Sequence, residues 1–189
     1  MTNVVRLCLL SVLLAHAVTA RAAECLGVTL ADTYQLEGET LLLNGLGARL
    51  ATMLKVKVYV AGLYLKQQST DAAAIIHTDQ PRHLVLRFVR DVSRKEITDG
   101  WTEGFKTNRA NMQGLATRIT ALNDAMVDLS SGSELVVSYA PEGGTTVSIG
   151  NDQKTVIQGA DFASAFISIW LGKPPNKEVK TGMLGGECD

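Results

Sequence analysis

The segment Val56–Leu65, VKVYVAGLYL, constrains the fold of this chain more than any other stretch. β-Branched and aromatic residues dominate it, and such residues favour an extended backbone packed within a sheet. Gly62 interrupts the run, which indicates either a β-bulge or a close approach by another part of the chain. The segment therefore predicts one long strand around which the other elements assemble.

Shorter strand patterns lie on both sides of this segment, separated by short turns. They fall at residues 28–36, 41–43, 83–89, 135–139, 145–149 and 154–157. Short turns favour antiparallel pairing of neighbouring strands. The stretch 44–47, NGLG, is interpreted as a glycine-rich corner. We expect six or seven mostly antiparallel strands.

The region after Ser93 carries a long helical pattern. Ser93 and Glu96 have the spacing of a capping box. Asn108 occupies an apolar stripe, so a continuous helix would point its amide toward the interior. Glycines weaken this helix, and a break near Asn111 is the alternative. The apolar members of the stripe are Trp101, Phe105, Met112, Leu115, Ile119, Leu122 and Met126.

Further helices are predicted at residues 69–77, at residues 161–171 and after Asn176. Helices that accompany an antiparallel sheet define the α+β class, with the helices layered on one face of the sheet. No internal repeat divides the chain, and a length of 189 residues suits a single domain.

The first 22 residues have the features of a signal peptide. Arg6 precedes the apolar run Leu7–Ala15, and small residues at Ala20 and Ala22 suit a signal peptidase. The run is shorter than the about 20 apolar residues that span a bilayer. We expect cleavage after Ala22, a domain over residues 23–189, a periplasmic or secreted location, and no stable membrane anchor after cleavage. An uncleaved anchor is the alternative.

Cleavage would leave two cysteines, Cys25 and Cys188, one near each end of the mature chain. In an oxidising compartment such a pair can join. We expect a disulfide between them that ties the two termini together, and two free thiols are the alternative. Cysteines this far apart have no metal-site spacing.

Composition and motifs exclude several classes of function. The formal net charge of −1 gives no basic footprint for nucleic acid. No P-loop, dinucleotide fingerprint or Gly-x-Ser-x-Gly elbow occurs. His77 and His83 have no acidic or thiol partner at ligand spacing. We therefore expect no metal, no cofactor and no nucleic-acid partner.

Five stretches, taken in order, carry a family resemblance. They are LNGLGARL (Leu43–Leu50), KVKVYVAGLYL (Lys55–Leu65), RFVRDVS (Arg87–Ser93), a tryptophan followed seven residues later by an asparagine (Trp101 and Asn108), and IWLGKPPNKEVK (Ile169–Lys180). Through them the chain resembles the chalcone-isomerase-like family, and most closely its exported bacterial branch. The resemblance implies an open-faced β-sandwich, in which helices cover a large antiparallel sheet and a ligand cleft lies between them.

The resemblance also implies which residues form the site. In true chalcone isomerases an arginine after the glycine-rich corner stabilises the substrate phenolate, and Arg49 stands at that place. The family asparagine persists as Asn108. Tyr59, Trp101 and Ile169 stand where the enzymes carry a threonine, a tyrosine, and a threonine or serine. Two of the enzyme's hydroxyls are therefore gone and a third has changed type, which argues against turnover by that mechanism.

The pair Arg49 and Tyr59 is similar instead to the plastid fatty-acid-binding members of the fold, where an arginine and a tyrosine hold a carboxylate. A guanidinium is always charged and offers a fork of donors to an anion. The implied ligand-binding residues are Arg49, Tyr59, Trp101 and Asn108, and the implied partner is a small apolar ligand with an acidic or phenolic head. The alternatives are a surface role for Arg49 and plain packing roles for Tyr59 and Trp101.

We therefore expect a periplasmic, non-catalytic protein that binds a fatty acid or a similar apolar acid in a cleft. Two alternatives stay open. One is an intramolecular lyase of the chalcone isomerase type that acts on a phenolic substrate, with Arg49 as its catalytic residue. The other is a structural or interaction module whose own side chains fill the cleft.

Overall fold

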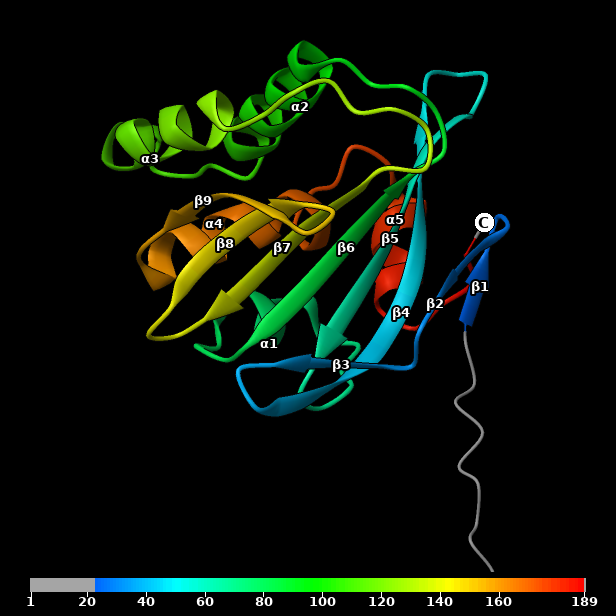
Figure 1. Cartoon of the computed structure of the whole chain (residues 1–189), viewed down its shortest axis with the longest axis horizontal. Coiled ribbons are helices and arrows are strands. Elements are labelled where there is room, and N and C mark those ends of the chain that lie inside the picture. The colour runs from blue at the N-terminus through cyan, green and yellow to red at the C-terminus, as the bar shows by residue number, and fades with distance from the viewer. Residues whose placement is uncertain (1–22, 189) are drawn as a thin grey trace, which may run out of the picture.

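The computed structural model describes residues 23–188, so the expected signal peptide over residues 1–22 lies outside the described part. The described residues form one large antiparallel sheet with a layer of helices on one face (Figure 1). This arrangement confirms the α+β fold with a helix-covered antiparallel sheet. Among residues 23–188, no helix is long and apolar enough to cross a membrane.

Seven strands follow one another in the large sheet in the order β3-β4-β5-β6-β7-β8-β9, and β1 and β2 form a separate hairpin. The strands are β1 (Ala23–Cys25), β2 (Val28–Leu30), β3 (Thr33–Leu36), β4 (Glu39–Ala51), β5 (Val56–Leu65), β6 (Arg82–Phe88), β7 (Glu134–Ala140), β8 (Gly144–Ile149) and β9 (Asp152–Ile157). The helices are α1 (Ala72–His77), α2 (Arg94–Thr107), α3 (Met112–Asp124), α4 (Ala160–Leu171) and α5 (Lys177–Met183).

Alternation along the strands divides the core between the two faces of the sheet. The helix-covered face holds the larger cluster, which includes Leu63, Leu84, Leu86, Phe105, Leu135, Phe162, Phe166 and Trp170. A smaller cluster on the other face lies under the β1–β2 hairpin, and it includes Leu30, Leu41, Leu46, Val60 and Tyr64. The predicted strand over Val56–Leu65 contributes to both clusters, which explains why almost every residue in it is apolar.

Helix α5 packs directly on the backbone of β4, and glycines on both elements permit this contact. A Cβ atom built on Gly47 would lie 2.1 Å from the carbonyl oxygen of Val179, and one on Gly182 would lie 2.0 Å from that of Leu46. The predicted corner at residues 44–47 is therefore wrong, because these residues continue a 13-residue strand. The glycines serve close approach to a helix rather than a change of chain direction.

The β1–β2 hairpin is fastened to the rest of the molecule at two points. A disulfide joins Cys25 of β1 to Cys188, so the two ends of the described chain lie together. Leu30 packs on Gly62, where an added Cβ would lie 2.4 Å from the leucine Cδ1 atom. The bulges of the β4–β5 pair lie elsewhere, so Gly62 marks a close approach.

The apolar stripe after Ser93 belongs to two helices. Asn108 ends α2 as its C-cap, and Asn111 begins α3, where its side chain accepts a hydrogen bond from Gly114 N. The continuous helix that would point Asn108 inward is therefore not formed, and the alternative break near Asn111 is confirmed. Local capping by an asparagine outweighs the continuity of the apolar pattern here.

The face of the sheet opposite the helices carries a buried histidine. His83 is 1% exposed and its Nδ1 atom lies 2.8 Å from Ser138 Oγ. The ring of Tyr34 stacks on it with 3.5 Å between the ring centroids. Burial lowers the pKa of His83 to about 4, because the imidazolium would lose its hydration there.

We predict that Gly47→Ala and Gly182→Ala each destabilise the fold by about 2–3 kcal/mol or more, because the added methyl group meets backbone atoms. The matched control is Gly100→Ala in α2, where an added Cβ meets nothing within 4 Å. That control should be neutral or stabilising by up to about 1 kcal/mol. Urea unfolding of the three variants measures the difference. Equal stabilities for Gly47→Ala and Gly100→Ala would contradict the close contact between β4 and α5.

We also predict that His83 makes stability depend on pH between about 6.5 and 4. Between these pH values the unfolded chain binds a proton at His83 that the folded chain does not bind. The free energy of unfolding is therefore highest above pH 6.5 and falls by up to about 3 kcal/mol toward pH 4. His83→Gln should flatten this part of the curve, whereas His77→Ala, which alters an exposed histidine at the end of α1, should keep it. Denaturant unfolding at a series of pH values measures both. The same slope in wild type and His83→Gln would exclude His83 as its source.

Candidate functional site

A pocket of about 360 Å³ opens on the helix-covered side, where β4, β5 and β6 meet the first half of α2, the end of α4 and the segment after it. Its volume falls in the range of small-molecule sites, about 300–1,000 Å³. Most of its lining is apolar. The lining residues are Arg49, Ala51, Val58, Tyr59, Leu86, Phe88, Arg90, Val92, Glu96, Ile97, Asp99, Gly100, Trp101, Ile169, Trp170 and Pro175.

Sheet register brings Arg49 and Tyr59 together. They are cross-strand partners on β4 and β5, so their side chains lie on the same face. Arg49 follows Gly45 and Gly47 at steps of two, so it emerges beside the face that α5 covers. A register shift after Arg49 leaves Val58 without a partner on β4, and this bulge lets adjacent residues of β5 line one pocket.

Within residues 23–188, the Arg49 guanidinium donates hydrogen bonds only to neutral oxygens. Its Nη1 atom donates hydrogen bonds to the carbonyl oxygen of Leu50 and, over 3.4 Å, to Asn176 Oδ1. Asn176 is itself fixed to β4, since its Nδ2 atom donates to the carbonyl oxygen of Ala48 over 3.0 Å. Arg49 forms no ion pair with any carboxylate of residues 23–188. Its charge is therefore available to an anion that enters the pocket.

Tyr59 offers a hydroxyl proton in the same pocket. Trp170 Nε1 donates a hydrogen bond to the Tyr59 hydroxyl oxygen over 2.9 Å. Within residues 23–188, no hydrogen bond has this hydroxyl as its donor. Burial raises the pKa of Tyr59, and the Trp170 bond and the Arg49 charge oppose this only in part, so the phenol stays protonated. The tyrosine can therefore donate to an oxygen of a ligand.

Trp101 lies in the wall of the pocket, as does Ile169. Trp101 is 5% exposed and meets Phe166 edge to face, with ring centroids 5.2 Å apart. Neither Trp101 nor Ile169 carries a hydroxyl group. The wall at these positions is suited to an apolar chain.

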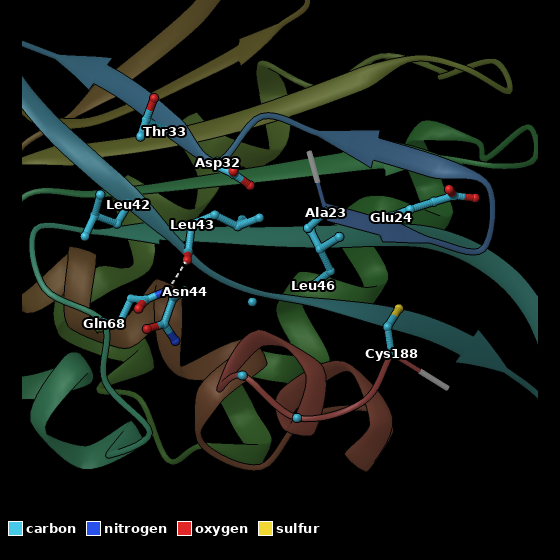
Figure 2. A pocket seen from close by; sticks show the side chains of 13 residues that line it. Ala23, Glu24, Asp32, Thr33, Leu42, Leu43, Asn44, Leu46, Gln68 and Cys188 are labelled. Carbon is cyan, nitrogen blue, oxygen red and sulfur yellow. Dashed lines mark hydrogen bonds between the residues drawn. The ribbon is translucent and has the colours of Figure 1, made fainter. Parts of the chain in front are cut away.

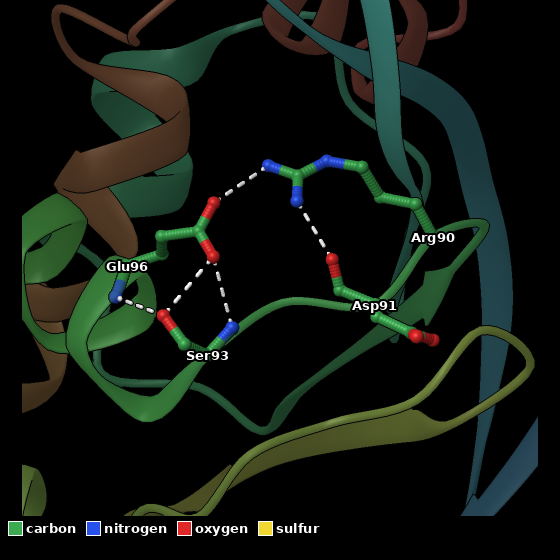
Figure 3. A network of polar contacts seen from close by, with 4 residues as sticks. All are labelled: Arg90, Asp91, Ser93 and Glu96. Carbon is green, nitrogen blue, oxygen red and sulfur yellow. Dashed lines mark hydrogen bonds and ion pairs between the residues drawn. The ribbon is translucent and has the colours of Figure 1, made fainter.

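A second arginine in the pocket is already neutralised. Arg90 Nη2 forms an ion pair with Glu96 Oε1 over 2.9 Å, and its Nη1 atom donates to the carbonyl oxygen of Asp91 (Figure 3). The predicted capping box is confirmed, because Glu96 Oε2 accepts from Ser93 N over 2.9 Å while Ser93 Oγ accepts from Glu96 N. The hydrogen bonds that Glu96 accepts from Ser93 N and from Arg90 lower the pKa of its carboxyl group to about 2.

Asn108 lies away from the pocket lining. Its Oδ1 atom accepts a hydrogen bond from Lys173 N over 2.7 Å, and its Nδ2 atom donates to the carbonyl oxygens of Gly104 and Lys173. The amide is thus occupied in joining the end of α2 to the segment after α4. The structure brings Arg49, Tyr59 and Trp101 together and places Asn108 in a local structural role.

A larger cavity of about 580 Å³ lies elsewhere, between the β1–β2 hairpin, β4 and the C-terminal segment (Figure 2). Glu24 and Asp32 are the charged side chains that line it. Their carboxylates would repel an acidic head group. Gln68 Nε2 donates to the carbonyl oxygen of Leu43 at its edge, so this polar group is already used. The smaller pocket also has two carboxylates in its lining, but Glu96 is paired with Arg90 and Asp99 with Lys95. Because it holds Arg49 in addition, the smaller pocket suits an anionic ligand better.

Sequence reasoning missed several residues that line the pocket or contact Arg49. Arg90 lies within the RFVRDVS stretch, but its place in the pocket depends on the turn between β6 and α2. Asn176, which accepts a hydrogen bond from Arg49, was expected only to precede the last helix. It stands at the N-cap position of α5 without a capping hydrogen bond from its side chain. Trp170 and Asp99 had no local signal of a site. In residues 23–188, no group of three or more His, Cys, Asp or Glu side chains could hold a metal ion.

The comparisons with known proteins agree with the fold. Residues 22–185 match the chalcone isomerase-like family. The structure is similar to the crystal structure of the fatty-acid binding protein AtFAP1 of Arabidopsis thaliana, with a TM-score of 0.72 and 11% sequence identity. That match covers 87% of this chain and 96% of the plant chain. No match was found among curated protein sequences.

The family match extends over nearly the whole described domain, and it includes the strands and helices that build the pocket. This chain therefore belongs to the chalcone isomerase-like family.

Proposed function

We propose that this protein binds a fatty acid or a similar apolar acid in the pocket of Arg49 and Tyr59. The observation that carries the proposal is the unpaired charge of Arg49 beside the free hydroxyl proton of Tyr59, both facing a mainly apolar wall. An anionic head would gain a charge-assisted hydrogen bond from Arg49. The acyl chain would lie along the wall that includes Trp101 and Ile169.

Four observations support a binding role over turnover. The apolar wall at Trp101 and Ile169 offers no hydroxyl to hold a reacting water, and Tyr59 is hydrogen-bonded to Trp170. Glu96, an acid of the pocket, is held as a carboxylate by its bonds to Ser93 and Arg90. The structural neighbour in plants is named as a fatty-acid binding protein, which is consistent with the same class of ligand.

We further propose that the protein works in the periplasm or outside the cell. The Cys25–Cys188 disulfide supports this location, because disulfides persist in oxidising compartments. The apolar run near the start of the sequence supports export with cleavage after Ala22.

The head-group contact predicts how the affinity for an apolar acid changes. A long-chain fatty acid should bind wild type, and Arg49→Ala should weaken it at least tenfold, or about 1.4 kcal/mol. Tyr59→Phe should also weaken binding, since it removes the hydroxyl donor and leaves the ring. Arg109→Ala is the control, because it removes the same charge from an exposed turn outside the pocket. Fluorescence titration measures all four proteins.

A second ligand makes this test specific for the head group. The corresponding fatty alcohol has the same tail and no charge, so wild type should prefer the acid while Arg49→Ala should bind both nearly equally. No binding of the acid by wild type would overturn the fatty-acid proposal. Equal affinities of wild type and Arg49→Ala for the acid would show that the head group binds elsewhere.

Export predicts a defined N-terminus for the mature protein. Expression in a bacterial host with its own leader should yield, from the periplasmic fraction, a chain that begins at Ala23. Intact-mass measurement reads both the cleavage site and the disulfide, since the latter lowers the mass by two hydrogens. A cytoplasmic, full-length chain with free thiols would contradict this proposal.

A further inference from the structure

The turn between β4 and β5 presents two large apolar side chains to solvent. Met53 is 101% exposed and Leu54 is 87% exposed, whereas the other exposed large hydrophobic residues among residues 23–188 range from 38% to 44%. The turn is well defined, because Lys55 N donates to the carbonyl oxygen of Thr52 over 3.2 Å. In Figure 1 it extends past the ends of the neighbouring strands, near the loop that enters α2. We call residues 52–55 the hairpin tip.

Such exposure is unusual for a soluble domain and points to a partner surface. Thr52 and Lys55 have φ angles of 63° and 50°, an uncommon conformation for residues other than glycine. These two residues bracket Met53 and Leu54, so the backbone holds both apolar side chains at the outermost point of the turn. The turn therefore presents the two apolar side chains together, as a short apolar wedge that projects into solvent.

The charged residues next to the hairpin tip along the chain are positive, and Glu178 of α5 is an acidic neighbour of Lys55 in space. Residues 40–70 contain Arg49, Lys55, Lys57 and Lys66 and no acidic residue, although the whole chain carries a formal net charge of −1. Lys55 is the last residue of the tip and Lys57 is the second residue of β5, and both are exposed. An apolar wedge flanked by lysines is complementary to a bilayer with anionic head groups.

The hairpin tip is also continuous with the pocket. Ala51 immediately precedes it and Val58 follows it by three residues, and both line the pocket beside Arg49. A surface bound by the tip would therefore lie at the Arg49 end of the site. Apolar acids are poorly soluble in water and reside in bilayers with their carboxylates at the head-group level, which is where this end of the pocket would be held.

We propose that the hairpin tip docks the protein on an anionic lipid surface, with Met53 and Leu54 inserted among the acyl chains and Lys55 and Lys57 on the head groups. Docking brings the mouth of the pocket to the source of its ligand. This inference rests on the proposed function, because it supplies the route by which an apolar acid reaches Arg49.

Vesicle binding tests the proposal. The mature protein should co-float with vesicles of phosphatidylglycerol and phosphatidylcholine at least tenfold more strongly than with phosphatidylcholine alone, and 0.5 M salt should weaken this preference. The double substitution Met53→Ser with Leu54→Ser should reduce binding at least tenfold. The control is Val127→Ser with Val156→Ser, which removes two exposed apolar side chains far from the tip in sequence and should leave binding unchanged.

Two outcomes would overturn the proposal: no vesicle binding by wild type, or equal binding by wild type and the tip variant. Titration with a short, soluble acid such as decanoate separates this proposal from the function itself. If decanoate binds wild type and the tip variant alike but vesicles are not bound, only the docking proposal fails. If decanoate does not bind wild type while vesicles are bound through the tip, the acid-binding function fails and the docking surface stands alone.

Discussion

The backbone contact between β4 and α5 is the constraint on which the site depends. Glycines on both elements let the helix rest on the strand, with Gly182 and Gly47 in direct contact. This contact brings Asn176, at the start of α5, within hydrogen-bonding distance of the β4 carbonyl at Ala48. Arg49 is the next residue on that strand, so the packing that closes the fold also fixes the residue that gives the pocket its charge.

A difference between two arginines gives the pocket its chemical character. Arg90 is neutralised by Glu96, which is itself committed to the cap of α2, so this pair can serve as a rigid edge (Figure 3). Arg49 meets only neutral oxygens of Leu50 and Asn176. Arg49 is a cation next to an apolar wall, and it has no carboxylate partner. The negative head group of a ligand would therefore stabilise its charge more than the neutral oxygens of the described residues do.

Residue patterns along the chain predicted the sheet and part of the site. The density of β-branched and aromatic residues placed Val56–Leu65 with its observed bounds, and the match of Arg49 and Tyr59 to a known pair anticipated their meeting in one pocket. Close backbone packing has no local signature that separates it from a turn, so residues 44–47 were misjudged as a corner. The role of Asn108 depends on its bonds to the segment at Lys173, which is distant in sequence and invisible to periodicity.

The central claim is that Arg49 and Tyr59 receive the head of an apolar acid. A crystal structure with a brominated fatty acid, located by the anomalous signal of bromine, tests it most directly. The account predicts the carboxylate within about 2.7–3.2 Å of the Arg49 guanidinium and the Tyr59 hydroxyl, and the bromine beside Trp101 or Ile169. Ligand found instead in the cavity beside Glu24 and Asp32, or a head group turned away from Arg49, would contradict it.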